Sequence, residues 1–257
     1  MGRDLYVAAS GGIARLLQLD VAANNIANIN TVGYKAQRLL TEEQKFSDTL
    51  TSKITDSLPR AQNDFVQSPG TVVVGTKTDF SAGPVEQTGN PLDVAITDDN
   101  AFFVVQPPNG QGEEFVTRAG NFTLNATRQL VTEDGYLVMG TGGAIVLPEQ
   151  GEITISPTGN IVVDAQQVGQ LRVVRPENME GLVREAGTRF KLVDQEREPA
   201  VLPNPNLIPK SVEMPNVNVV TAMVDLVTAQ RAFEGYQKTV RSIDELNEAA
   251  LRTARPN

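Results

Sequence analysis

Five carboxylates come nearest to a chemical site in this sequence. They lie in or near predicted β-turns and are Asp93, Asp98, Asp99, Glu113 and Glu114. A pair of carboxylates can hydrolyse a glycosidic bond, and a group of carboxylate oxygens can bind calcium. No companion base, nucleophile turn or phosphate-binding loop accompanies these acids. Because such acids are ordinary on an acidic β surface, we expect no enzyme activity and no catalytic, metal-binding or cofactor-binding residues.

The residue types that are missing point the same way. The chain of 257 residues has no histidine, no cysteine and no tryptophan. Histidine is the commonest general base and metal ligand, and a thiol nucleophile or disulfide requires cysteine.

Asp93 alternates with Leu92 and Val94, which favours a structural role for its carboxylate. Arg118 and Arg231 can each be an anchor between elements or subunits, or a solvated surface charge, and the sequence leaves both open.

The net charge of −9 is unevenly distributed. Residues 1–35 hold three basic and two acidic groups, and residues 216–257 hold five of each, so the middle of the chain is the acidic part. This argues against nucleic acid as a partner, since its phosphates require basic side chains. The longest wholly apolar run, Ala101 to Val105, is too short to span a bilayer, and the N-terminus lacks an apolar signal segment. We therefore expect neither membrane insertion nor a cleaved secretory signal.

The two ends of the chain carry the clearest periodic patterns. Small and apolar residues recur every three or four positions, which predicts one helix from about Leu5 to Asn28 or Asn30 and another from about Val217 to Arg252. This spacing is typical of the seam of a coiled coil. The larger side chains of the predicted assembly seam are Leu5, Leu16, Leu19, Ile26, Leu226, Phe233, Tyr236, Val240 and Ile243.

A hairpin of these two helices would be marginally stable alone. Ordering about seventy terminal residues costs on the order of 1–2 kcal/mol each in backbone entropy, whereas each larger seam side chain returns only about 1.5–3 kcal/mol on burial. We therefore expect further burial against neighbouring copies or related subunits.

Local features of the first helix allow two interpretations. The Gly11-Gly12 pair either breaks the segment into two short helices or marks the close approach of a neighbouring backbone. Asn24, Asn25 and Asn28 either end the helix or fix its register through hydrogen bonds, and we favour register. Gly33 is expected to stop the helix in a left-handed turn.

Between the helices the pattern changes twice. Residues 36–70 are polar and predict a connector, with a helical piece around Glu42 to Ile54. From Thr71 to about residue 205, short β-rich runs alternate with Gly-containing turn signals, which predicts an antiparallel β body. Four prolines between residues 203 and 215 then predict a stiff return arm.

The predicted fold class is therefore α+β, with paired N- and C-terminal helices enclosing a central antiparallel β domain. The predicted domains are a helical core formed by residues 1–35 and 216–257, a connector at 36–70, and an outer β domain with its return arm at 71–215.

Three blocks of sequence resemble the bacterial flagellar basal-body rod proteins, with the hook protein as a more distant relative. The first is LDVAANNIAN at 19–28 with TVGYK at 31–35. The second combines GNPLDVAI at 89–96, FFVV at 102–105 and TRAGNF at 117–122. The third is NVNVV at 216–220 with AQRAFE at 229–234. Two positions depart from the family pattern: residues 98–101 replace a glycine-rich turn, and Arg128 stands where glycine is usual.

The resemblance implies a structural subunit of the hollow rod that crosses the periplasm and transmits torque. It implies as partners other copies of the chain, other rod subunits and the flagellar type III export apparatus, with no cofactor. The chain is most similar to the proximal rod subunit. The alternatives are a distal rod or hook-type subunit of the same family, or a monomeric secreted β-rich binding module.

Overall fold

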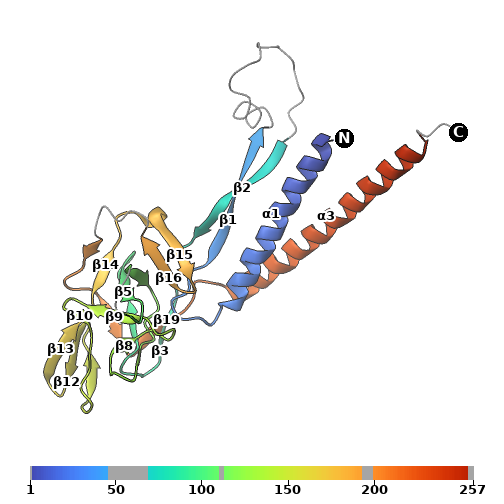
Figure 1. Ribbon diagram of the computed structural model, residues 1–257. Helices are drawn as coiled ribbons and strands as arrows, with labels where there is room; N and C mark the ends of the chain where they lie inside the picture. Colours follow the sequence, from blue (N-terminus) through green and yellow to red (C-terminus); the bar gives the residue numbers. More distant parts are fainter. Residues whose placement is uncertain (1, 46–68, 110–112, 193–198, 254–257) are drawn as a thin grey trace, which may run out of the picture. The chain divides into compact units, whose positions relative to one another are not determined.

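The computed structural model describes residues 2–45, 69–109, 113–192 and 199–253. The chain divides into two compact units. The helical unit comprises Met1–Ala27, Gln37–Asp79 and Asn218–Asn257, and the β body comprises Asn28–Ala36 and Phe80–Val217. Figure 1 shows the elements of both. Each unit is built from segments that are far apart in the sequence, and the domain boundaries inferred above stay a prediction.

The helical unit contains two helices and one pair of strands. The helices are α1 (Gly2–Ala27) and α3 (Val219–Thr253), and the strands are β1 (Gln37–Lys45) and β2 (Pro69–Thr78), which pair antiparallel. The N-terminal and C-terminal helices are thus confirmed, with ends within a few residues of those predicted. α1 contacts α3 and both strands. None of the helices within the described ranges is long and apolar enough to cross a membrane.

An asparagine sets the start of α3. The side-chain oxygen of Asn218 accepts hydrogen bonds from the backbone N–H groups of Val220 (3.0 Å) and Thr221 (3.1 Å). These are N–H groups that a helix cannot satisfy internally, so an asparagine immediately before the first turn stabilises it.

The Gly11-Gly12 pair does not break α1, which is continuous through it. The interpretation of two short helices is therefore wrong. A Cβ atom added at Gly12 would overlap the aromatic ring of Tyr236 on α3. The close neighbour of Gly12 is thus a ring and not a backbone, and glycine leaves the space that this ring occupies.

The helical piece expected around Glu42 to Ile54 is wrong over Glu42–Lys45, which belong to β1. Residues 46–54 lie outside the described residues. In β1, residues Thr41 and Glu42 pair with Val73 and Val72 of β2. Pairing with a β-branched partner strand overrides the helix propensity of the glutamates and glutamine, which is a weak local preference.

The predicted antiparallel β domain is confirmed in the β body, where every strand pair is antiparallel. The largest sheet has the order β15-β16-β6-β5-β9-β8-β7, with β10 beside β9, and with β14 between β5 and β17. Its strands are β5 (Phe102–Gln106), β6 (Phe115–Thr117), β7 (Thr123–Leu124), β8 (Leu130–Val131), β9 (Leu137–Gly140), β10 (Gly143–Ala144), β14 (Val173–Arg175), β15 (Leu182–Ala186), β16 (Arg189–Leu192) and β17 (Ala200–Val201). A 3₁₀ turn, η1 (Met179–Gly181), precedes β15.

Strand β5 is apolar on both faces because both faces are buried. Phe103 and Val105 belong to the larger core cluster, whereas Phe102 and Val104 belong to a second cluster. Successive side chains of a strand point to opposite sides, so β5 separates the two clusters. This explains why its sequence is a continuous apolar run and does not alternate with polar residues.

Smaller sheets complete the β body. One contains β11 (Ile153–Ile155), β12 (Asn160–Val163) and β13 (Gln166–Gln170). The others pair β18 (Leu207–Pro209) with β4 (Val94–Ile96), and β19 (Ser211–Glu213) with β3 (Val85–Gln87). The proline-rich stretch therefore contains two paired strands of the β body.

Two positions that depart from the family pattern have left-handed backbone conformations. Arg128 has φ 62° and Asn100 has φ 57°. Glycine adopts such angles without strain, asparagine tolerates them, and arginine does so rarely. A guanidinium nitrogen of Arg128 donates to the carbonyl of Pro148, which holds the side chain in place.

Gly33 lies in the segment that follows α1 and belongs to the β body. Its φ is 69°, and its N–H donates to the carbonyl of Glu213 at 2.7 Å. A Cβ atom added there would overlap the backbone of Ala119. Both the conformation and the space at this position therefore exclude a side chain.

We expect Gly33→Ala to lower the free energy of unfolding of the β body by about 3 kcal/mol, measured by urea denaturation of the full chain. Roughly 1 kcal/mol of this comes from the left-handed backbone and the rest from the overlap with Ala119. Gly89→Ala is the matched control, because Gly89 has φ 80° with open space around it. It should cost only about 1 kcal/mol, and equal costs at the two positions would contradict the close approach.

Candidate functional site

The predicted seam residues on α1 and α3 are for the most part half-buried. Leu16 is 46% exposed. The half-buried members are Leu19, Ile26, Leu226, Phe233, Tyr236 and Val240. The side chains of Leu5 and Ile243 lie outside the described ones. Phe233 and Tyr236 stack on each other with ring centroids 6.5 Å apart.

The described side chains that are fully buried on the two helices are small. They are Ala14 and Ala22 on α1, and Ala222 and Ala229 on α3, each at most 7% exposed. Alanine buries little apolar area, so contacts made by its methyl group contribute little free energy. The fully buried side chains described on α1 and α3 therefore contribute little to the apolar area that the helical unit buries.

A second apolar face of α3 is exposed, and we call it the outer stripe. It consists of Val220, Met223, Val224 and Val227, whose exposed fractions range from 47% to 70%. The spacing of three, one and three residues places the four side chains on one side of a helix. Residues two apart on a helix point roughly 200° away from each other, so the outer stripe lies opposite Ala222 and Ala229. The sequence reasoning above missed it because it followed only one seam.

Asn25 fastens the end of α1 to the start of β1. Its side chain donates to the carbonyl of Gln37 at 2.8 Å and accepts from the N–H of Gln37 at 2.9 Å. The Asn25 side chain thus bonds both backbone groups of Gln37, as a residue of a neighbouring strand would. The side-chain oxygen of Asn28 accepts a hydrogen bond from the hydroxyl of Thr31 at 3.2 Å, within the segment after α1. Asn24 is exposed, and the role of these amides in register stays a prediction.

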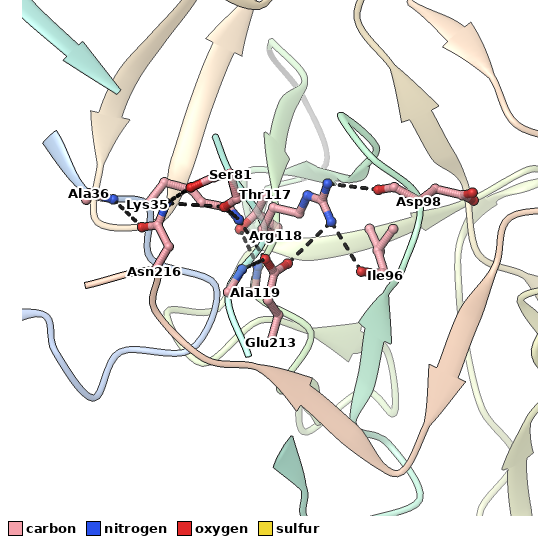
Figure 2. Close-up of polar contacts among 11 residues, drawn as sticks. Lys35, Ala36, Ser81, Ile96, Asp98, Thr117, Arg118, Ala119, Glu213 and Asn216 are labelled. Atoms are coloured by element: carbon pink, nitrogen blue, oxygen red, sulfur yellow. Dashed lines mark hydrogen bonds and ion pairs between the residues drawn. The ribbon is translucent and has the colours of Figure 1, made fainter. Parts of the chain in front are cut away.

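Among the residues of the β body that the structure describes, the most deeply buried charged cluster joins Lys35, Arg118 and Glu213, and we call it the ionic junction (Figure 2). The Lys35 ammonium lies 2.6 Å from one carboxylate oxygen of Glu213, and the Arg118 guanidinium lies 3.3 Å from the other. The three side chains are 1–2% exposed. A buried charge is stable only when it is paired and hydrogen-bonded, so each member depends on the others.

Backbone groups complete the ionic junction. The Lys35 ammonium also donates to the carbonyl of Ser81 at 2.7 Å, and Arg118 donates to the carbonyls of Ile96 (3.2 Å) and Asp98 (2.9 Å). The N–H of Gly83 donates to the Glu213 carboxylate at 2.9 Å. Figure 2 shows these groups converging from separate strands and loops. Of the two arginines left open by the sequence, Arg118 is a buried anchor and Arg231 is exposed.

Burial lowers the pKa of the Arg118 guanidinium, and the charges of Glu213, Asp99 and Asp98 oppose this shift. The side chain stays a cation, because the ordinary pKa of arginine lies far above neutrality. The ionic junction therefore carries two positive charges and one carboxylate. The ring of Phe102, 5.3 Å from the guanidinium carbon, offers its face to the excess charge.

Arg184 of β15 adds a second connection to the segment that follows α1. It lies over the rings of Tyr34 (4.6 Å) and Phe190 (4.9 Å) and donates to the carbonyl of Lys35. Burial raises the pKa of the Tyr34 phenol, and the Arg184 charge partly offsets this effect. Tyr34 is thus a neutral ring packed against a cation.

Two of the five carboxylates considered above accept hydrogen bonds from loop residues of the β body. Asp93 is buried and accepts hydrogen bonds from Thr88 (2.6 Å) and Asn90 (2.8 Å). Burial acts to raise the pKa of Asp98, but hydrogen bonds from Asn206 and the charges of Arg175 and Arg118 outweigh it and hold the pKa below its usual value.

The other three carboxylates are engaged separately or exposed. Glu113 pairs with Lys191, and Glu114 pairs with Arg172 at 2.8 Å. Asp99 is exposed. Within the described part of the chain, no three His, Cys, Asp or Glu side chains form a group that could hold a metal ion.

We expect Glu213→Gln to lower the free energy of unfolding by about 3–5 kcal/mol, because it leaves two cations buried without an anion. The measurement is urea denaturation of the full chain at neutral pH. The matched control is Glu114→Gln, which removes the same charge from a more exposed ion pair: the side chain of Arg172 is 22% exposed and that of Glu114 is 36% exposed. It should cost at most about 1 kcal/mol, and a similar loss in both variants would contradict a special role for the ionic junction.

Three family models match the sequence in succession. The model described as "Flagella basal body rod protein" matches residues 5–35, and the model described as "Flagellar hook protein FlgE/F/G D1 domain" matches residues 95–163. The model described as "Flagellar basal body rod FlgEFG protein C-terminal" matches residues 208–253. The first and third of these matches cover most of α1 and α3, and the second lies in the β body.

Curated relatives match over almost their whole length. The flagellar basal-body rod protein FlgG of Caulobacter vibrioides is 34% identical over 95% of this chain and 97% of its own. FlgF of Salmonella typhimurium is 32% identical over 95% of both chains, and FlgF of Caulobacter vibrioides is 30% identical over 98% of this chain and 97% of its own. At this identity over nearly complete chains, the resemblance seen in the three sequence blocks is confirmed, and the chain belongs to the family of flagellar basal-body rod proteins.

Proposed function

We propose that this structural rod subunit assembles into the rod through its two terminal helices, which pair along the predicted seam as in a coiled coil. The observation that carries the proposal is the outer stripe of α3, four large apolar side chains of which the most exposed, Val220, is 70% accessible to solvent. Contiguous exposed apolar surface of this kind is typical of protein interfaces.

The distribution of side-chain size on α3 supports assembly. Among its described side chains, the fully buried ones are those of Ala222 and Ala229, whereas Val224 and Met223 have more than half of their surface exposed. A monomer gains more by burying valine and methionine than by burying alanine. The arrangement is favourable when other subunits cover the outer stripe, as it would be inside a tube of packed helices.

The partners that we propose are other copies of this chain, other flagellar rod subunits and, during delivery, the flagellar type III export apparatus. The proposed location is the rod in the periplasmic space, and the proposed mechanical role is torque transmission. The proximal rod subunit remains the preferred position. A distal rod or hook-type position is the runner-up, and relatives named FlgG and relatives named FlgF both match the chain.

We propose no enzymatic activity. The five carboxylates first considered accept hydrogen bonds within the β body, form separate ion pairs or face solvent, and the relatives are named as rod proteins. Catalysis by carboxylates requires two of them to face one reacting bond.

Limited proteolysis of dilute protein separates the rod subunit from the alternative of a monomeric secreted binding module. The rod proposal expects protease-sensitive ends and a resistant body near residues 71–205, and fully protected ends would favour the alternative.

Val224→Asp should reduce incorporation of the subunit into rods at least about tenfold, because a charge in a covered apolar face loses its hydration. Val183→Asp on β15 is the matched control, since Val183 (52% exposed) is as accessible as Val224 (58% exposed). Quantification of the subunit in purified basal bodies provides the measurement. Equal incorporation of the two variants would contradict a role of the outer stripe in assembly.

Phe233→Asp tests the predicted seam in the same assay. The substitution should leave the β body folded, because Phe233 belongs to the helical unit, and should prevent incorporation into the rod. Circular dichroism and the urea transition of the purified variant report on folding, and swimming in soft agar reports on assembly. Normal motility with this variant would rule out the seam.

A further inference from the structure

Besides the segment of Arg118, the ionic junction and its backbone partners join three parts of the β body that are far apart in sequence. The first is the segment that follows α1, which contributes Gly33 and Lys35. The second is the start of the long segment of the body, which contributes Ser81 and Gly83. The third is β19, whose last residue, Glu213, accepts hydrogen bonds from Gly33, Lys35 and Gly83.

We propose that the ionic junction is a latch: residues 28–36 dock on the rest of the β body, and β19 pairs with β3, in one cooperative step. Ordering of the chain directly after α1 is thereby coupled to ordering of the chain directly before α3. This coupling is a property of the β body itself and does not rest on the rod function proposed above.

The electrostatic part of the argument concerns what Glu213 would lose. If residues 28–36 left the β body, the Glu213 carboxylate would lose the Lys35 ammonium at 2.6 Å, and its backbone carbonyl would lose the Gly33 N–H at 2.7 Å. Its remaining cation, Arg118, is the more distant one at 3.3 Å and is shared with two carbonyls. A carboxylate that is 2% exposed tolerates such a loss only if the surrounding structure opens to water.

The second part of the argument is steric and concerns the partner of β19. The N–H of Met214 donates to the carbonyl of Pro84 at 2.8 Å, and Glu213 pairs with Val85 in the register of β19 and β3. Gly83 lies so close to the carbonyl of Met214 that a Cβ atom would overlap it. An opening at Glu213 therefore cannot be confined to one side chain, since the neighbouring backbones are in direct contact.

Neutral hydrogen bonds at the margin of the latch align the same three parts. The side-chain oxygen of Asn216 accepts from the N–H of Ala36 at 2.7 Å, and its amide nitrogen donates to the hydroxyl of Ser81 at 3.0 Å. Asn216 is only half-buried, so each of these bonds adds a smaller but still measurable share to the stability of the latch. The buried pair of Lys35 and Glu213 therefore dominates the coupling.

Hydrogen exchange of the full-length protein tests the latch. Lys35→Met keeps a side chain of similar length and removes its charge. In this variant the amides of Gly33 and Met214 should both exchange about tenfold faster or more, since coupled sites respond together. The amides of Val104 and Leu130, which donate to Arg172 and Ile145 within the β body, should keep their rates.

Two other outcomes would overturn the proposal. Faster exchange at Gly33 with an unchanged rate at Met214 would show that the two ends are independent. An equal acceleration at Gly33, Met214, Val104 and Leu130 would show loss of global stability and no local latch. Lys191→Met is the matched control, because Lys191 forms a more exposed ion pair with Glu113 (34% and 48% exposed), and it should change none of these rates.

If Lys35→Met does not fold, Asn216→Ala decides the question. This milder variant removes the bonds from Asn216 to Ala36 and Ser81 without altering any buried charge. It should accelerate exchange at both Gly33 and Met214 while leaving Val104 and Leu130 unchanged. Acceleration at only one of the two latch amides, or at neither, would overturn the coupling.

Discussion

A carboxylate withdrawn from water must keep its cations, and at Glu213 this requirement organises the β body. Its carboxylate bonds Lys35, which is 178 positions away in the sequence, and Arg118, which is 95 positions away. No short stretch of chain can satisfy it alone. Replacing such a cluster by apolar residues is often neutral for stability, whereas removing one partner is costly. The ionic junction therefore specifies which segments meet more than it adds to stability.

The helical unit differs from the β body in what it buries. The described side chains that are fully buried on α1 and α3 are alanines, while valines and a methionine of the outer stripe remain exposed. Soluble monomers place their bulky apolar residues inside, so α3 has the apolar pattern of a helix with neighbours on more than one side. The proposed rod assembly gives this pattern a reason. The chain thus combines a β body that pairs its buried carboxylate Glu213 internally with helices that leave apolar surface available.

The sequence predicted those features that repeat at short range. The two helices follow from spacings of three and four residues, and the β domain follows from short apolar runs between turn signals. Local propensity failed at Glu42–Lys45, where pairing with β2 determines the strand. It could not reveal the ionic junction, because Lys35, Arg118 and Glu213 share no local pattern and each is ordinary in its own surroundings. The sequence allows Arg118 to be an anchor but does not identify its partners, and it marks Lys35 only as part of a block that resembles the rod proteins.

Three of the four positions where the chain enters or leaves the β body are held beside one another. Ala36 and Ser81 are both hydrogen-bonded to Asn216, and Lys35 bonds Ser81 as well. A domain whose connections emerge at one place can be inserted into, or removed from, a host fold with little distortion of the host. The β body therefore has the arrangement of an inserted domain that can be exchanged as a unit. Lineages could therefore enlarge, shrink or replace it while the helical unit keeps its own geometry, and protein engineers could graft a foreign domain at the same attachment point.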